Sequence, residues 1–408
     1  MVPFLLLAAA AAAPSAPAAT APAPRSETIV VTGTRLADTE KALRECIARH
    51  CPPNEDIRAS LAHAENLFVA GRYRDARDVT KASIGRNNRY RKDYPVDVSD
   101  LYRGNARIAE HLGEAADFQL STALMKGIIG SAFGKDDPRA IKADVEVGDM
   151  FAKLGQFNQA RTTYDATEKR ARAAGLPAIA DIARVRSAWT YAMDGAIPVA
   201  RKALEKIAAD PAPEARIGRL SSLVLLARLD RNEGKTGRAS AALFAELRTI
   251  HAKRPVLLFS PRLDIGGDAP EGDNAETTVN EPKTPTTRMM AGNAYFEKHW
   301  VDVGFWVTPD GKVGEPEILR GEGTRDWTKP LLRSIAGRLY TPSEDPDGSY
   351  RVERYTLTSR FMTDLSGTHQ RTRSPNVRVE FLDLTADPAA AAPPSGTGGG
   401  AAAPVPAR

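Results

Sequence analysis

A glycine recurs at nearly constant spacing through the first part of the chain, and this period limits the folds open to the sequence. The glycines stand at positions 71, 113, 155, 195 and 234, so the successive intervals are 42, 42, 40 and 39 residues. The surrounding stretch, 55–254, is rich in Ala, Leu, Arg and Glu, which favour helices. A period of about 20 to 50 residues is typical of stacked supersecondary units. The sequence therefore predicts a solenoid of helix pairs over 55–254.

The residues that follow each glycine suit a tight turn between two packed helices. A glycine can end the first helix because the turn needs a residue without a Cβ atom. The aromatic or aliphatic residue two positions later enters the groove between the helices, and an alanine three positions further on lets them approach closely. The residues expected to shape and pack these repeats are Gly71, Tyr73, Ala76, Gly155, Phe157, Ala160, Gly195, Ala200, Gly234 and Ala239.

The pattern G-x-[YF]-x-x-A resembles the inter-helix signature of the tetratricopeptide repeat (TPR) family. The resemblance covers about half of the chain, and the period here exceeds the standard TPR unit, so it implies variants with long helices. It also implies a groove that binds a peptide or a partner helix. Small-residue helix pairs in an unrelated bundle are the alternative.

From Trp300 onward the apolar residues recur with period two, as in strands. Apolar positions 301, 303, 305 and 307 alternate with others, and Pro309-Asp310-Gly311-Lys312 then reverses the chain. The remaining expected elements are a returning strand over 313–319, a helix over 326–339 and strands over 350–362 and 377–381. This order, β-β-α-β, predicts a small α+β module with its helix packed on a sheet.

The stretch VGFWVTPDGKV, residues 303–313, and the later Tyr340-Thr341-Pro342 resemble the C-terminal domain of TonB proteins, the periplasmic energy transducers of Gram-negative bacteria. A true transducer keeps an uncleaved membrane helix and a long proline-rich linker, whereas this chain has a short leader and the solenoid. The resemblance therefore implies the binding module of TonB and not its energy transduction. An unrelated two-layer sandwich with a Pro-Asp-Gly hairpin is the alternative.

The expected fold class is thus multidomain, an all-α TPR-like solenoid followed by a small α+β TonB C-terminal-like domain. The whole arrangement is similar to TPR/TonB-C proteins of sphingomonad-type bacteria, which are often labelled energy transducers. The expected divisions are a leader over 1–24, a strand-like segment and helix over 25–54, repeats over 55–254, a linker over 255–298, the TonB-like domain over 299–384 and an Ala/Pro/Gly tail over 385–408. We expect the tail to be disordered, because it has few apolar side chains to bury.

The leader predicts export. Its apolar run over 4–13 has about the length of a signal-peptide core and is too short to span a bilayer. Ala16-Pro17-Ala18 is one cleavage site, although no Lys or Arg precedes the run, so an alanine-rich disordered tail is the alternative. We expect a periplasmic protein without a stable transmembrane segment in its mature form.

The stretch ETIVVTGTR, residues 27–35, reads as a lone strand ahead of the helices. It resembles the region near the mature N-terminus of TonB-dependent receptors, where a TonB box pairs with the sheet of a transducer. One hypothesis is that it adds to an edge of the 301–362 sheet, in the same molecule, where it must span the repeats, or in a neighbour. The other is that it is a flexible lead-in or pairs elsewhere. The residues of this hypothetical strand addition are Ile29, Val30, Val31, Thr32 and Gly33.

The two cysteines, Cys46 and Cys51, could close a short loop in an oxidising compartment, and two free thiols are the alternative. Their C-x4-C spacing without a second pair argues against zinc, so no metal is expected. The net charge of +5 is small for 408 residues and no basic block occurs, so no nucleic-acid partner is expected.

The sequence contains no H-E-x-x-H, G-x-S-x-G, phosphate-binding glycine loop or dinucleotide fingerprint. We therefore expect neither an enzyme nor a cofactor. The function expected from the residues and the resemblances is a periplasmic protein–protein interaction scaffold that binds through a TPR groove and a TonB-like sheet edge. The alternative is an accessory or transducer-like component of TonB-dependent outer-membrane transport. The expected partners are TonB-dependent receptors or further copies of this chain.

Overall fold

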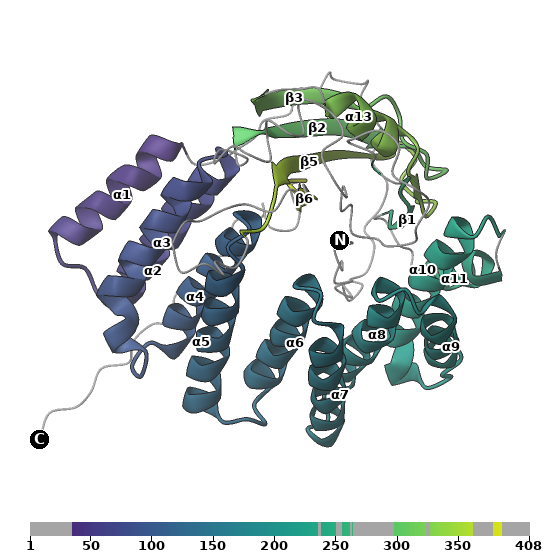
Figure 1. Cartoon of the computed structure of the whole chain (residues 1–408), viewed down its shortest axis with the longest axis horizontal. Helices are drawn as coiled ribbons and strands as arrows, with labels where there is room; N and C mark the ends of the chain where they lie inside the picture. Colours follow the sequence, from purple (N-terminus) through teal and green to yellow (C-terminus); the bar gives the residue numbers. More distant parts are fainter. Residues whose placement is uncertain are drawn as a thin grey trace, which may run out of the picture.

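The computed structural model describes residues 35–235, 238–249, 255–261, 263, 298–323, 327–361 and 378–385. In this part of the chain the helices follow one another along an arc, and a sheet lies across it (Figure 1). The leader, the strand-like Ile29–Gly33 and the Ala/Pro/Gly tail lie outside the described residues, as does most of the expected linker.

The helices stack in consecutive antiparallel pairs after a single leading helix. Their bounds are α1 (Leu36–Ala48), α2 (Pro53–Val69), α3 (Tyr73–Asn87), α4 (Pro95–His111), α5 (Ala115–Phe133), α6 (Pro138–Lys153), α7 (Phe157–Ala173), α8 (Pro177–Met193), α9 (Ile197–Ala208), α10 (Arg216–Asn232) and α11 (Arg238–Thr249). The 3-10 turns η1 (Asn88–Tyr90) and η2 (Pro213–Ala215) precede α4 and α10. Proline opens α2, α4, α6 and α8, where its missing N–H would have no partner in any case.

The periodic glycines lie in the turns that end α2, α4, α6, α8 and α10. Each has a positive φ, for example +79° at Gly71 and +74° at Gly155, a conformation that a Cβ atom disfavours. Of the packing residues, Tyr73 at 1% and Ala76, Ala160 and Ala200 at 0% exposure are buried between helices. Phe157 is half-buried, and Ala239 lies in α11, where its side chain is outside the described part. The turns thus set a common geometry for successive helix pairs.

The sheet has the order β3-β2-β5-β6, with every pair of neighbours antiparallel. The elements of this region are β1 (Leu257–Phe259), β2 (Trp300–Val307), β3 (Glu317–Glu322), α13 (Thr328–Ala336), β4 (Leu339–Tyr340), β5 (Ser349–Thr358) and β6 (Arg378–Asp383). The expected order β-β-α-β corresponds to β2, β3, α13 and β5, but β4 lies between the last two. The helix expected over 326–339 ends at Ala336, and Leu339 belongs to β4 instead. The returning strand was expected from Val313, but Val313 makes only an isolated bridge to Val307 and β3 begins at Glu317.

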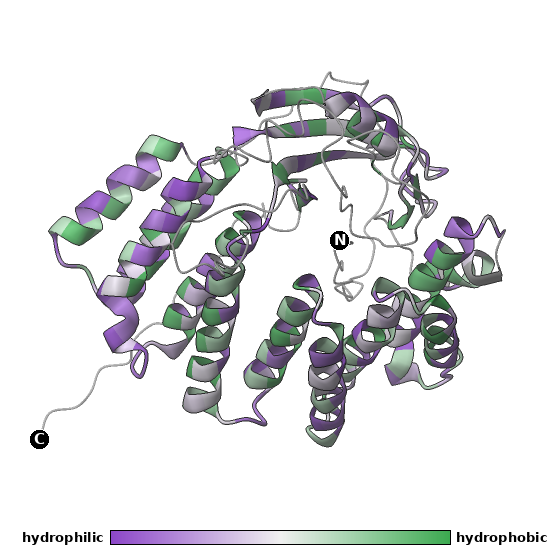
Figure 2. Cartoon of the chain, in the orientation of Figure 1, coloured by the Kyte–Doolittle hydropathy of each residue, from purple (hydrophilic) through white to green (hydrophobic). Residues whose placement is uncertain are grey.

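One face of the sheet forms its own core under α13. Hydrophobic and hydrophilic residues alternate along the strands (Figure 2). The buried cluster consists of Val301, Val303, Phe305, Val307, Trp327, Leu331, Ile335, Tyr340, Tyr355 and Leu357. All of these residues come from the sheet region, so this core does not depend on the repeats.

The expected linker over 255–298 contains structure that belongs to the sheet region. β1 pairs antiparallel with β4, and the Thr341 amide donates a hydrogen bond to the Val256 carbonyl over 2.8 Å. The Arg351 guanidinium also donates to the Pro255 carbonyl over 2.7 Å. The sheet region therefore begins earlier than the expected boundary at 299, because β1 pairs with β4 and Pro255 is bound by Arg351 of β5.

A disulfide joins Cys46 in the last turn of α1 to Cys51 ahead of α2, with Cα atoms 5.2 Å apart. The linked stretch includes His50, whose φ is +53°. None of the described helices combines the length and apolar composition that crossing a membrane requires.

Candidate functional site

The second face of the sheet turns toward the repeats and docks on them. The Tyr73 hydroxyl at the start of α3 lies 2.9 Å from the Thr356 hydroxyl of β5. The indole of Trp300 covers the turn at Gly71, where an added Cβ atom would lie 2.4 Å from the indole nitrogen. Trp300 also joins Leu67, Tyr73 and helix residues in one buried cluster. The Trp300 end of β2 and the facing part of β5 are thus packed against α2 and α3, the first helix pair.

Arg354 is the central charged residue of this contact, and its side chain is fully buried. Its Nε lies 2.5 Å and its Nη2 2.9 Å from the two carboxylate oxygens of Asp302. Its Nη1 donates to the Phe68 carbonyl at the end of α2 over 3.1 Å, and its guanidinium lies 3.9 Å from the Trp300 ring. Bidentate pairing and a third acceptor satisfy the buried cation, which limits the cost of its desolvation.

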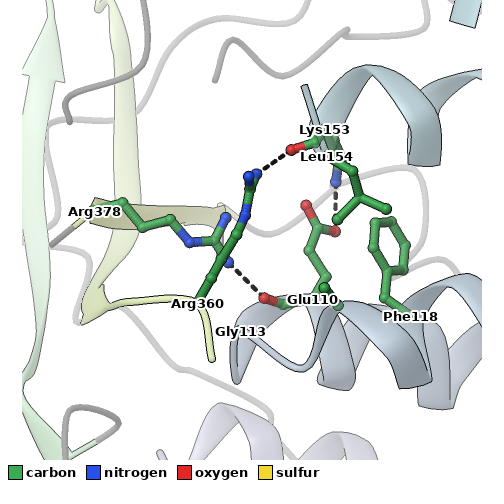
Figure 3. A pocket seen from close by; sticks show the side chains of 8 residues that line it. Glu110, Gly113, Phe118, Lys153, Leu154, Arg360 and Arg378 are labelled. Atoms are coloured by element: carbon green, nitrogen blue, oxygen red, sulfur yellow. Dashed lines mark hydrogen bonds and ion pairs between the residues drawn. The ribbon is translucent and has the colours of Figure 1, made fainter. Parts of the chain in front are cut away.

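Further donors from the sheet region bind the carboxyl ends of α2, α4 and α6, the first helices of three successive helix pairs. Helix ends leave backbone carbonyls without intrahelical partners and carry a partial negative charge, so they attract guanidinium groups. At α4, Arg378 donates to the Glu110 carbonyl over 2.7 Å and Thr358 to the His111 carbonyl over 3.1 Å. At α6, Arg360 donates to the Lys153 carbonyl (Figure 3). The remaining contacts are Arg320 to the Val69 carbonyl over 3.4 Å and the Phe361 amide to the Gly113 carbonyl over 3.2 Å.

Buried and half-buried ionisable side chains gather between α4, α6 and β6. Lys153 lies 2.5 Å from the Glu110 carboxylate, and burial raises the pKa of Glu110. Burial also pushes up the pKa of Glu380, but Arg378 and His111 outweigh it and bring that pKa below its usual value. These charges balance one another across the junction of sheet and repeats.

A shallow cleft with a volume of about 10 Å³ lies at the same place and is partly open to solvent (Figure 3). A typical small-molecule site has roughly 300–1,000 Å³. Its lining residues are Glu110, Gly113, Ala115, Phe118, Lys153, Leu154, Arg360 and Arg378. Within the described ranges no group of three His, Cys, Asp or Glu side chains is arranged to hold a metal ion. The described side chains at this junction mainly contact one another, from the repeats on one side and the sheet on the other.

His111 makes the junction sensitive to acid. Burial lowers its pKa to about 4, against Glu380, which raises it, and Arg378, Arg354 and Lys153, which lower it further. Because the unfolded imidazole titrates near about 6.5, its contribution is retained above that pH and lost as the pH falls toward about 4, at roughly 1.4 kcal/mol per pKa unit. We expect a His111→Phe chain to show a smaller decrease in urea midpoint than the wild type between pH about 7 and 5. Equal decreases in both chains would contradict this assignment.

Two large apolar side chains are exposed on the other half of the repeat-facing sheet surface. Trp306 is 51% and Leu319 46% exposed, and the rings of Trp306 and Tyr350 lie 5.3 Å apart. Gly304 is buried beneath the Tyr350 side chain, because an added Cβ atom would lie 2.0 Å from the Tyr350 hydroxyl and 3.1 Å from Leu319. The platform Trp306–Tyr350–Leu319 is thus an apolar patch at the far end of β2 from Trp300.

Strand β3 borders this platform and forms one edge of the sheet. Among the described strands it pairs with β2 alone, so its outer N–H and C=O groups are free of strand partners. The carboxylates of Glu315, Glu317 and Glu322 are exposed on and beside it. An unprotected edge with exposed apolar side chains is suited to pairing with an extended chain.

The far end of the sheet region is held at α10. Arg228, whose pKa burial lowers to about 10, donates to the Leu257 carbonyl of β1 over 2.7 Å. Leu258 packs in an apolar cluster with residues of α10 and α11. The sheet region therefore contacts the arc at both ends, through guanidinium–carbonyl bonds and Trp300 at α2–α6 and through an apolar strand at α10.

The strand-addition residues Ile29–Gly33 lie outside the described part, but the helix that follows them does not. Leu36, the first residue of α1, packs against the cluster that contains Trp300. The sheet thus docks close to the start of α1, and the pairing of Ile29–Gly33 with a sheet edge stays a prediction. The sequence did not point to Arg354, Arg360 and Arg378, since charged residues on the face opposite an apolar core are usually solvated.

Comparisons with known proteins identify no family for the chain and give structural neighbours of low similarity. No protein-family model matches the chain, and no curated protein sequence is significantly similar to it. The structure of BtubC (BKLC) from P. vanneervenii has a TM-score of 0.42 and 14% identity, covering 60% of this chain and 100% of that one. A kinesin light chain-like protein from Podosopora anserina with nearly identical TPR-like repeats has a TM-score of 0.38 and 17% identity, covering 49% of this chain and 96% of that one. A variant of the latter gives the same values.

Proposed function

We propose that this protein is an interaction scaffold that binds an extended segment of a partner protein along β3 and over the Trp306–Tyr350–Leu319 platform. The observation that carries the proposal is the free edge of β3 beside exposed Leu319 and Trp306. Strand addition supplies main-chain hydrogen bonds, and pockets for alternate side chains supply specificity. We infer no catalytic activity.

The surrounding charges indicate the chemistry of the partner. The edge carries the exposed carboxylates Glu315, Glu317 and Glu322, while Arg320 is engaged with Asp302 over 2.6 Å. Opposite charges across an interface favour encounter and fix register. We therefore propose an apolar strand with Arg or Lys at its ends as the bound segment.

The periplasm is the proposed location. The disulfide between Cys46 and Cys51 supports an oxidising compartment, because such bonds are rare where thiols are kept reduced. The apolar leader of the sequence supports the same proposal. The element order β2, β3, α13, β5 is that of the TonB-like resemblance and supports receptors of TonB-dependent transport as candidate partners.

The test uses a labelled peptide that copies residues 25–35, RSETIVVTGTR, whose apolar centre lies between two arginines. We expect it to bind a chain that begins at Arg35, and Trp306→Ala to weaken binding at least about tenfold, by loss of the aromatic platform. The matched control is Leu120→Ala, which removes a 58% exposed side chain on α5 and should leave the affinity unchanged. Equal peptide affinities of Trp306→Ala and Leu120→Ala would show that the platform does not bind the peptide.

The alternative partners are separated by a second readout. Envelope extracts should yield TonB-dependent receptors with the wild-type chain and not with Trp306→Ala if the transport role holds. Binding of the peptide without any recovery of receptors would leave a scaffold with other partners.

A further inference from the structure

The carboxyl-end turns of α2, α4 and α6 form a second surface, distinct from the β3 edge, and this surface already has an occupant. Its acceptors are backbone carbonyls at Phe68, Glu110, His111, Gly113 and Lys153. Four of their donors lie close together in the sequence, on β5 and just beyond it. These donors are Arg354, Thr358, Arg360 and the Phe361 amide.

The repeat architecture explains why one strand can reach all three helix ends. Successive helix pairs place equivalent turns side by side, so the carbonyls at these turns form a row. A strand laid across this row offers a donor to each turn in succession: Arg354 reaches α2, Thr358 reaches α4 and Arg360 reaches α6. Because the acceptors are backbone carbonyls, the specificity of this contact depends on the bound segment. That segment must be extended and must carry guanidinium groups at the right spacing.

The sheet can leave this surface without losing its own core. The core under α13 contains only residues of the sheet region. Trp300 is the one buried residue that the sheet region adds to the described apolar clusters of the first helix pairs. At the opposite end, Leu258 of β1 stays packed among residues of α10 and α11. This asymmetry gives a pivot at α10 and a releasable end at α2–α6.

We propose that the turn surface of α2, α4 and α6 is a binding site for arginine-bearing extended segments, held closed by the chain's own β5 and opened to a partner segment of the same chemistry when the sheet swings away. A site that is mostly occupied binds an external ligand with an apparent affinity reduced by the free fraction. Release of the sheet should therefore raise the affinity for such a segment.

The probe is a labelled peptide that copies Tyr350–Phe361, and the proteins are full-length chains. Gly71→Ala should release the sheet, because its new Cβ would lie 2.4 Å from the Trp300 indole nitrogen, and Trp300 is absent from the peptide. Gly155→Ala is the matched control: its φ of +74° imposes the same backbone strain, but nothing lies within 4 Å of the new Cβ. Gly71→Ala/Gly113→Ala should block the peptide, because a Cβ at Gly113 would lie 2.2 Å from the carbonyl oxygen of Ser359.

We expect Gly71→Ala to bind the peptide at least about tenfold more tightly than the wild type and Gly155→Ala, and the double variant to lose this gain. Small-angle scattering should show a larger radius of gyration for Gly71→Ala alone of the two single variants. A released sheet without a gain in peptide affinity would overturn the proposal. A gain in peptide affinity by Gly155→Ala would also overturn it. Trp300→Ala removes the Gly71–Trp300 contact from the side of the sheet, and an unchanged radius of gyration in both Trp300→Ala and Gly71→Ala would likewise overturn the proposal.

Discussion

The Arg354→Met chain is expected to lose about 3–5 kcal/mol of its free energy of unfolding, because the substitution leaves a buried carboxylate without its main partner. Asp302 is 1% exposed, and Arg354 donates to both of its carboxylate oxygens, over 2.5 Å and 2.9 Å. The variant also loses the bond to the Phe68 carbonyl and the contact with the Trp300 ring. Urea denaturation followed by circular dichroism measures the change.

Arg320→Met is the matched control for this prediction. Arg320 binds the same Asp302 carboxylate over 2.6 Å, but its side chain is 53% exposed. Solvent screens such a pair, so the expected loss is below about 1 kcal/mol. A comparable loss in both variants would mean that burial does not distinguish the two arginines and that Asp302 itself is the determinant.

The repeats could be predicted from the sequence because their signal is local. A glycine with positive φ, a ring and an alanine within six residues describe one turn, and the recurring interval then gives the stack. The sheet was predictable for the same reason: alternation at positions 301–307 marks a core-facing side, and the observed core residues Val301, Val303, Phe305 and Val307 are the ones that alternate.

The docking of the sheet on the repeats could not be predicted, because its signal is long-range. Tyr73 and Thr356 are 283 residues apart in sequence, and the local sequence around either residue does not indicate that they are in contact. Arg354 stands on the face opposite the core, where charge normally indicates solvent. Its acceptor at Phe68 is a backbone carbonyl, and a backbone group leaves no trace in the identity of a residue.

The two ends of the repeat-facing side of the sheet therefore have different roles along β2. At one end Trp300 and Asp302 are buried against helices, and at the other Trp306 is exposed beside Tyr350. The same strand thus serves intramolecular docking and, in our proposal, partner binding. A ligand on the platform and the contact at Gly71 are separate surfaces, so variants in each can be read independently.

Trp300→Ala is expected to destabilise the chain by about 3–5 kcal/mol and to uncouple the sheet from the repeats. Trp300 is 6% exposed and is the residue of the sheet region that enters the cluster of Leu67, Tyr73 and Ile108. Without it, the sheet no longer contributes a side chain to this apolar cluster of the helix stack. We expect the single urea transition of the wild type to separate into two, with Trp189 in α8 and Trp327 beside α13 as fluorescent reporters of the two parts.

Trp306→Ala is the matched control, since it removes the same side chain from the same strand. Trp306 is 51% exposed, and surface substitutions of this kind change stability by about 0.5 kcal/mol or less. Its transition should stay single while its peptide affinity falls. The opposite result, a destabilised Trp306→Ala beside a cooperative Trp300→Ala, would mean that the sheet is held to the repeats through its platform end and not through the turn at Gly71.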